Sequence, residues 1–401
     1  MKTNPDYNTR VDLFKESPTR KIDVIKEKLQ LEGKDIILLS TGQPSIPPPR
    51  WAREKLAEEL LEESMWLYAY TPTQGRKSVL EAIRRELEEH GLNLGERQIT
   101  LTAGGQSALF ATITVLFKQG DNVVVFDPMY FGYWPLLDYV GVNVIDIVED
   151  IRQGFKPDLD KLEEIASEKK IKAVILVTPD NPTGRIITRK EAERLASLAE
   201  KHGFYIIVDE AYRTLVYEGE HHYIYKYAPH RVIALNAFSK DPGIPGWRLG
   251  FAYGPEWIIQ RIKLVVQETV YCTPSVAQRL VEIYLLDRER RREHIERVKQ
   301  IYKSKRDAMI SEIEKTLPKA EYVKPKGGMF LFLNLEKYLK PKSITAEQLS
   351  LKLLEEKGVA TVPGSYFSKH YKYALRLSFV SETPERIREG IHRLAQLLGE
   401  I

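Results

Sequence analysis

Lys240 and Asp209 are the residues of this 401-residue chain whose types and positions point most directly to chemistry. Lys240 comes shortly after the apolar run 231–235, and Asp209 directly follows the run 204–208. Both runs indicate buried strands, so both side chains are expected at strand ends, where α/β proteins place their ligands. A lysine amine at such a position can form a Schiff base. A carboxylate there needs a cation or hydrogen-bond donors, because its burial is otherwise costly.

Three further segments follow predicted strands and offer groups for an anion or a flat ring. Gly105 and Gln106 lie in a turn that opens into a helix. The free N–H groups of such a turn suit phosphate, although a plain strand-to-helix turn fits equally well. Tyr130, where the chain leaves the strand 122–126, offers a ring for stacking. Asn181 offers an amide, but its segment is also rich in residues typical of ordinary turns.

One cofactor, pyridoxal 5′-phosphate, would engage all of these groups. Its aldehyde needs Lys240, its ring nitrogen needs Asp209, and its flat ring suits Tyr130. Its phosphate suits the helix terminus at Gly105 and the guanidinium of Arg248. A free lysine titrates near ~10.4. Conjugation, burial and the nearby Arg248 are expected to lower the basicity of Lys240, so that it can accept and return a proton.

The ordered set of motifs resembles the class I/II aminotransferases, fold-type I pyridoxal-phosphate enzymes that include aspartate, aromatic and 2-aminoadipate aminotransferases. The resemblance covers nearly the whole chain. It implies that Lys240 is the Schiff-base lysine, that Asp209 pairs with the pyridinium nitrogen and that Arg248 binds the phosphate. It also implies a cofactor-binding role for Gly105, Gln106, Tyr130, Asn181, Tyr212 and Ser239. Of these, Tyr212 counts with Lys240 and Asp209 as catalytic.

The resemblance extends to substrate binding and assembly. Gly42 and Asn181 match positions that lie against the substrate, and Arg376 matches the arginine that clamps its α-carboxylate through two parallel bonds. Tyr70 matches a tyrosine that reaches the cofactor phosphate of the neighbouring subunit. The resemblance therefore implies a homodimer.

Two positions depart from the family pattern. Many relatives carry a phosphate-binding serine where this chain has Ala237, and whether Ser239 replaces that contact stays open. Some aspartate aminotransferases carry a lysine for the distal carboxylate of the substrate where this chain has Gln106. Together with the aromatic residues Tyr68, Tyr130 and Tyr133, this favours broad specificity for aromatic amino acids, 2-aminoadipate or glutamate, with aspartate left open.

The predicted reaction is a ping-pong exchange of an amino group between an L-amino acid and a 2-oxo acid. A first alternative is a C–S β-lyase or a decarboxylase, which would use the same cofactor residues. A second is a regulator that binds the cofactor without catalysis. The short N-terminal arm disfavours that alternative, because it leaves little room for a DNA-binding helix-turn-helix.

The elements that must position these residues divide into two groups. Apolar strands alternate with helices between residues 98 and 253, which predicts an α/β fold with a mainly parallel sheet covered on both faces, residues 251–253 adding an edge strand. The run 287–297 interleaves both signs of charge and predicts a long helix with a solvated face. We expect a large cofactor-binding domain over 49–295. Residues 1–48 and 296–401 are expected to form an N-terminal arm and a smaller α+β domain.

Composition excludes several other classes of protein. With 43% apolar residues the chain can bury a large core, and a net charge of +4 does not favour nucleic acid or an acidic membrane as partner. Cys272 is the single cysteine and cannot make an intramolecular disulfide or a thiolate metal cage. No apolar run approaches the ~20 residues of a membrane span, and residues 1–6 lack the apolar core of a signal peptide. His221 and His222 lack a second ligand pair, so no metal is predicted. A cytoplasmic location is expected.

Overall fold

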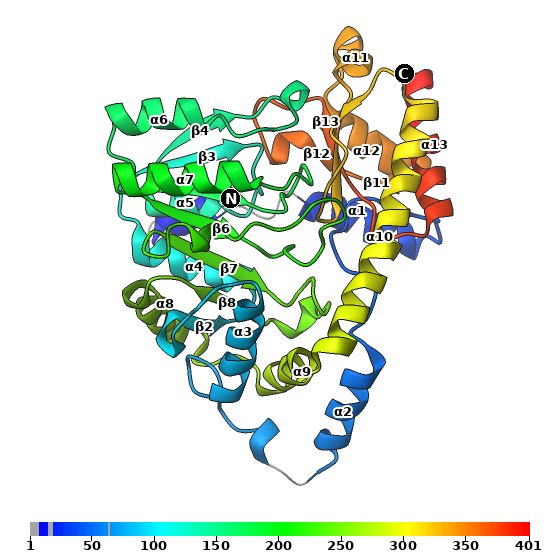
Figure 1. Ribbon diagram of the computed structural model, residues 1–401. Helices are drawn as coiled ribbons and strands as arrows, with labels where there is room; N and C mark the ends of the chain where they lie inside the picture. Colours follow the sequence, from blue (N-terminus) through cyan, green and yellow to red (C-terminus); the bar gives the residue numbers. More distant parts are fainter. Residues whose placement is uncertain (1–7, 15–18, 63–64) are drawn as a thin grey trace.

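The computed structural model describes residues 8–14, 19–62 and 65–401 and centres on a seven-stranded sheet (Figure 1). Its strand order is β2-β8-β7-β6-β5-β3-β4. The pairings from β7 to β4 are parallel, whereas β8 runs antiparallel to both of its neighbours. The bounds are β2 Ile99–Thr102, β3 Asn122–Asp127, β4 Asn143–Val148, β5 Ala173–Val177, β6 Tyr205–Asp209, β7 Val232–Ala237 and β8 Gly250–Tyr253. The predicted mainly parallel α/β sheet is confirmed, while residues 1–7 and 15–18 of the expected arm lie outside the described ranges.

The expectation that residues 251–253 form an edge strand is wrong. β8 lies between β2 and β7, and all four of its residues are buried. A Cβ atom at Gly250 would lie 2.6 Å from the carbonyl oxygen of Asn236, so a glycine allows β8 to approach β7 closely. The edges are β2 and β4, and the latter exposes Asn143 and Val148.

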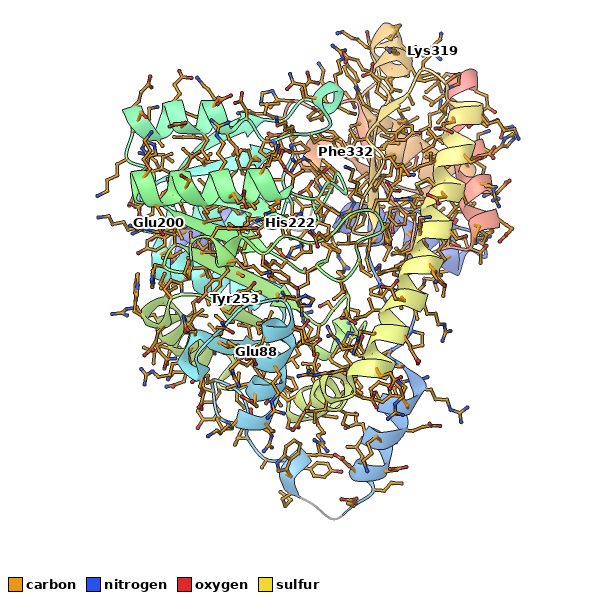
Figure 2. The ribbon with its side chains drawn as sticks, in the orientation of Figure 1. Glu88, Glu200, His222, Tyr253, Lys319 and Phe332 are labelled. Carbon is orange, nitrogen blue, oxygen red and sulfur yellow. The ribbon has the colours of Figure 1, made fainter. Side chains whose placement is uncertain are left out.

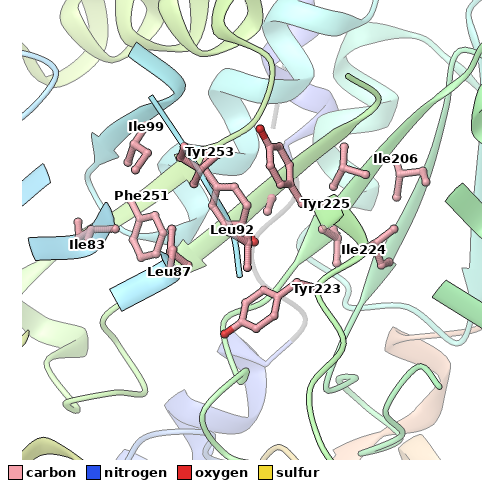
Figure 3. Close-up of a cluster of buried hydrophobic side chains, with 14 of the residues drawn as sticks. Ile83, Leu87, Leu92, Ile99, Ile206, Tyr223, Ile224, Tyr225, Phe251 and Tyr253 are labelled. Atoms are coloured by element: carbon pink, nitrogen blue, oxygen red, sulfur yellow. The ribbon is translucent and has the colours of Figure 1, made fainter. Parts of the chain in front are cut away.

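Helices cover both faces of the sheet, as the uninterrupted apolar strands predict. Along β5, Val174 and Leu176 pack with helices on one face, and Ala173 and Ile175 pack with helices on the other. Figure 3 shows part of the first of these cores. The first face carries α3 Lys77–Glu89, α6 Leu159–Glu168, α7 Arg189–His202 and α9 Ser275–Leu286. The second carries α4 Gly105–Leu116, α5 Trp134–Val140 and α8 Glu256–Val270.

A smaller unit with its own core adjoins this large unit. Its sheet has the order β12-β13-β10-β9, with antiparallel pairings, and Figure 2 labels Phe332 in it. N-terminal segments join this unit, since β1 pairs with β11 and α1 packs on α12 and β11. The strands are β1 Ile37–Leu38, β9 Glu321–Tyr322, β10 Phe330–Asn334, β11 Val359–Ala360, β12 Val362–Pro363 and β13 Ala374–Ser378. The helices are α1 Arg20–Leu31, α11 Glu336–Leu339, α12 Ala346–Lys357 and α13 Pro384–Glu400.

The helix α10, Arg288–Thr316, connects the two units, starting near α9 and α2 (Arg50–Leu60) and running up alongside α13 (Figure 1). The charge-rich sequence correctly predicts a long helix, but the prediction of a solvated face is wrong for two of its residues. Arg291 and His294 are buried, because this face of α10 packs against the large unit. In the described ranges, neither α10 nor another helix is long and apolar enough to cross a bilayer.

Candidate active site

A cavity of about 630 Å³ lies at the carboxyl ends of the parallel strands, where the two units meet. Phe330 and Arg376 line it from the small unit, and α1 borders it with Arg20, Asp23 and Lys26, a contribution that no signal in the sequence predicted. Predicted site residues that line the cavity are Gly42, Gly105, Gln106, Tyr130, Asn181, Asp209, Tyr212, Ser239, Lys240, Arg248 and Arg376. The fold therefore brings together groups that are spread over more than three hundred residues of sequence.

Lys240 projects into the cavity from the loop after β7. Its Nζ donates a hydrogen bond of 2.7 Å to the carbonyl oxygen of Gly42 and lies 5.7 Å from the ring centre of Tyr212. Burial, together with the positive charges of Arg376 and Arg248, lowers the pKa of Lys240 to about 8, against the opposing effect of Asp209. A larger fraction of this amine is therefore neutral at physiological pH than is the case for an ordinary lysine.

Asp209 is the last residue of β6, and its carboxylate is held on both oxygens. Oδ1 accepts a hydrogen bond of 2.9 Å from the amide of Ala211, and Oδ2 accepts one of 3.3 Å from the hydroxyl of Tyr133. Burial raises the pKa of Asp209 to about 6, and these two hydrogen bonds limit the rise. The carboxylate is consequently ionised at neutral pH. In the sequence Tyr133 stands out only as an aromatic residue, and its place in the same aromatic cluster as Tyr130 is the signal for its position near the site.

The turn that opens α4 combines a helix N-terminus with a cation. Gly104 caps α4 with φ of 80°, and a Cβ atom at this position would lie 2.6 Å from the guanidinium of Arg248. Arg248 itself has a left-handed backbone, with φ of 53°, and donates to the carbonyl oxygen of Pro245 at 2.9 Å. The Cβ atom of Ala237 lies 3.5 Å from the position that a Cβ at Gly105 would occupy, so this departure from the family borders the same turn. Backbone N–H groups and a guanidinium gathered in this way form an anion site.

Arg376 is the cationic group on the opposite side of the cavity. It lies in β13 and donates to Asn181 Oδ1 at 3.2 Å and to the carbonyl oxygen of Ser40 at 2.8 Å. The guanidinium carbon stands 4.0 Å from the ring centre of Phe330 and 4.9 Å from that of Phe367. Burial lowers the pKa of Arg376 to about 10, which still leaves it charged at neutral pH. Its Nε is buried and has no hydrogen-bond partner among the described residues, so one donor remains for a ligand.

Tyr70 is the predicted site residue that the structure leaves outside the cavity lining. Its side chain is 83% exposed, and its ring meets that of Tyr271 edge-on at 5.4 Å. A single chain therefore does not bring Tyr70 to its own Lys240.

The residues that line the cavity fit pyridoxal 5′-phosphate on structural grounds. The absence of a side chain at Gly104 lets the guanidinium of Arg248 lie against the turn, the ionised Asp209 faces the same space as Lys240, and buried Arg376 keeps an unused donor. A phosphate, a cationic ring nitrogen and a carboxylate each find a partner of opposite charge or hydrogen-bonding capacity.

Comparison with known proteins identifies a family whose members use the cofactor that the cavity lining fits. The family model "Aminotransferase class I and II" matches residues 34–394. The aspartate/prephenate aminotransferase of Thermus thermophilus is 29% identical over 391 residues, 97% of this chain and 98% of that protein. The aspartate aminotransferase of Thermotoga maritima is 30% identical over 395 residues, which cover 96% of this chain and 97% of that protein.

Solved structures agree over nearly the full length. The aspartate aminotransferase of Thermus thermophilus with maleate superposes with a TM-score of 0.90 at 27% identity, over 98% of this chain and 100% of that one. An aromatic aminotransferase of Pyrococcus horikoshii superposes with a TM-score of 0.84 at 27% identity, over 94% of this chain and 99% of that one. The chain therefore belongs to the class I and II aminotransferases, enzymes that use pyridoxal 5′-phosphate.

Proposed function

We propose that this aminotransferase binds pyridoxal 5′-phosphate in the cavity at the strand ends and transfers an amino group from an L-amino acid to a 2-oxo acid in two successive half-reactions. The observation that carries the proposal is the convergence of Lys240, Asp209 and Arg376 on one cavity. Residues 49–295 would form the cofactor-binding domain, with 1–48 and 296–401 as arm and small domain. The cytoplasmic location expected from the sequence stays a prediction.

The cofactor would be held by groups on the large unit. Lys240 would bond its aldehyde carbon, Asp209 would face the ring nitrogen, and Tyr130 would stack on the ring. When bound, the cofactor supplies an electron-accepting ring that stabilises negative charge at the substrate α-carbon. The other residues proposed to contact it are Gly105, Gln106, Asn181, Tyr212, Ser239 and Arg248.

The chain's own residues would then position the substrate and move the proton. Arg376 would take the α-carboxylate of the amino acid through two N–H donors, which fixes the α-carbon relative to Lys240. Lys240 would remove the α-proton at its Nζ and return it, since a pKa near 8 lets one amine act as base and acid at neutral pH. Burial raises the pKa of Tyr212 above its ordinary value, so its hydroxyl stays protonated and can donate a hydrogen bond.

We propose broad substrate specificity, covering aromatic amino acids, 2-aminoadipate and glutamate, with aspartate as a further candidate. The neutral Gln106 and the aromatic Tyr130 and Phe131 on the cavity wall support the inclusion of apolar substrates. Relatives are named for aspartate, prephenate and aromatic amino acids, which supports the aromatic substrates and aspartate in this proposal. A panel of amino donors tests this proposal, and turnover with aspartate alone would contradict it.

We also propose a homodimer in which Tyr70 completes the site of the partner. Supporting this, large apolar side chains gather in and near the segment that carries Tyr70 and are exposed on the single chain. They include Leu61 at 88% exposure, Met65 at 71%, Tyr68 at 61% and Tyr271 at 58%. Light scattering should give twice the chain mass. A monomer with full activity would contradict the dimer.

The transfer itself is tested with an amino donor labelled with nitrogen-15 and an unlabelled 2-oxo acid. An aminotransferase moves the label into the amino acid formed from the acceptor. A β-lyase would release labelled ammonia without any acceptor, and a decarboxylase would release carbon dioxide. Either of these products in place of label transfer would favour the alternative reactions.

A further inference from the structure

A buried carboxylate on α3 joins two buried arginines behind the cavity. Glu86 accepts hydrogen bonds of 2.7 and 2.9 Å from Arg213 and one of 3.1 Å from Arg291. All three side chains are at most 8% exposed. Burial alone would raise the pKa of Glu86, but the charges of Arg213 and Arg291 hold this pKa well below its ordinary value. Glu86 is therefore a permanent charge between two cations.

Each arginine leads to a segment of the active site. Arg213 directly follows Tyr212 in the chain. Arg291 also lies 3.5 Å from the carboxylate of Asp241, which directly follows Lys240. The hydroxyl of Tyr284 donates to the other oxygen of Asp241 at 2.5 Å. Arg213, Glu86, Arg291 and Asp241 thus form one continuous ionic chain between the backbone at Tyr212 and the backbone at Lys240.

The helix α10 lies next to the segment that carries Lys240 and Asp241, here called the lysine segment. Lys240 and Asp241 line a small cavity of about 10 Å³ together with His294, Val298 and Tyr302 of this helix. Arg291 lies in the first turn of α10. The ionic chain therefore attaches the lysine segment to the helix that connects the two units.

Stability alone does not account for such an arrangement. Burying a group of charges has a large desolvation cost, and well-packed apolar side chains of similar volume are often as stable or more so. What charge-assisted hydrogen bonds provide, and apolar contacts do not, is a fixed direction and distance. Proton transfer by Lys240 depends on such placement, since small displacements of a catalytic group have large effects on rate.

We propose that Glu86 and Arg291 are positioning residues for the transfer reaction, which hold Lys240 and Tyr212 at a fixed separation across the cavity. This proposal rests on the function proposed above. Neither residue touches the cavity, so both would act through Asp241 and Arg213.

The chain offers a matched control for the test. Glu89 and Arg288 join the same two helices, α3 and α10, through an ion pair of 2.8 Å. Their side chains are 33% and 51% exposed, so this pair lies at the surface and has no link to Asp241 or Arg213. Removal of the surface pair controls for the general effect of uncoupling α3 from α10.

The test compares Glu86→Gln and Arg291→Met with Glu89→Gln and Arg288→Met. For each full-length variant, kcat and KM are measured with saturating cofactor. In the cofactor-free chain, the pKa of Lys240 is obtained from the pH dependence of its acylation, followed by mass spectrometry of the peptide that contains it. We expect Glu86→Gln and Arg291→Met to lower kcat about tenfold with a smaller change in KM. We expect the pKa of Lys240 to rise in both, because a loosened segment admits water and relieves the burial that lowers it. Arg291→Lys should recover part of kcat, since it keeps the charge, while the surface variants should match the wild type.

Folded Glu86→Gln and Arg291→Met variants with wild-type kcat and wild-type Lys240 titration would overturn the proposal. Equal losses in the surface variants would also overturn it, because the effect would then be a general loss of helix contacts. If Glu86→Gln does not fold, the kcat values and the Lys240 titrations of Arg291→Met and Arg291→Lys test the proposal without it. Failure of the proposed function would appear differently, as a wild type without amino transfer, whereas the Lys240 titration reports on the ionic chain in either case.

Discussion

The two sides of the cavity are built in different ways. On the large unit, Asp209 ends β6, Lys240 follows β7 and Gly105 opens the helix after the edge strand β2, so that each group stands at or near the end of a strand of the large sheet. On the small unit, Arg376 lies inside β13 and is oriented by the rings of Phe330 and Phe367. The large-unit side carries charges of both signs, whereas the small-unit side presents the buried cation Arg376, with the less buried charges of α1 at its border.

This difference assigns separate tasks to the two sides. The large unit has the groups that exchange protons or hold the cofactor, so changes there should act on kcat or on cofactor affinity. The small unit has the group that would hold the substrate carboxylate, so changes there should act mainly on KM.

The largest effect is expected from Lys240→Ala. The substitution removes the amine that would transfer the α-proton, so kcat should fall about a thousandfold or more. Rapid mixing of the cofactor-loaded variant with an amino acid measures this step. Lys299→Ala, which removes a lysine paired with Glu296 away from the cavity, is the control and should keep wild-type rates. Comparable rates in Lys240→Ala and the wild type would refute the assignment.

On the opposite side, Arg376→Gln should raise KM for the amino acid about a hundredfold, because a charged two-point contact with the α-carboxylate is lost. The change in kcat should be smaller. Steady-state kinetics over a wide substrate range separates the two constants. An unchanged KM with a strongly reduced kcat would contradict the assignment of Arg376 to substrate binding.

Tyr133→Phe should change the pH dependence more than the rate at its optimum. Activity that needs ionised Asp209 falls as the pH decreases through its pKa of about 6. The Tyr133 hydroxyl lowers that pKa, so its removal should move the acid limb of the kcat profile to higher pH. A limb that stays in place, or moves to lower pH, would contradict the role of Tyr133.

The smallest effect is expected from Ala237→Ser. A hydroxyl next to the turn at Gly105 should add one hydrogen bond to the cofactor phosphate and lower the Kd for the cofactor about fivefold. Equilibrium dialysis of the cofactor measures this constant, with kcat expected to stay close to wild type. A weaker affinity would mean that the turn has no room for the serine side chain.

The two sides also differ in how much the sequence could predict. The cofactor side follows from local patterns, because each group stands next to an apolar strand that can be recognised from a few residues. The parallel sheet and the helix over 288–316 follow from periodicity in the same way. Residues 251–253 do not, since three apolar residues cannot show that β8 is inserted between β2 and β7.

Tertiary contacts account for what the sequence left out. Arg291 lies in a run of alternating charges that is typical of a solvated helix, and its contacts with Glu86, about two hundred residues earlier, and with Asp241 explain its burial. The aromatic rings beside Arg376 and the approach of α1 to the cavity also depend on the packing of distant segments. A sequence pattern records the period of an element but not which neighbour covers it.

The absorbance of the purified, cofactor-loaded protein, followed during addition of one amino acid with no 2-oxo acid present, tests amino transfer at this site. We expect the cofactor band to convert to that of pyridoxamine phosphate, and a 2-oxo acid then to restore it. An unchanged band while ammonia or carbon dioxide is released, or no band after cofactor is added, would contradict amino transfer at this site.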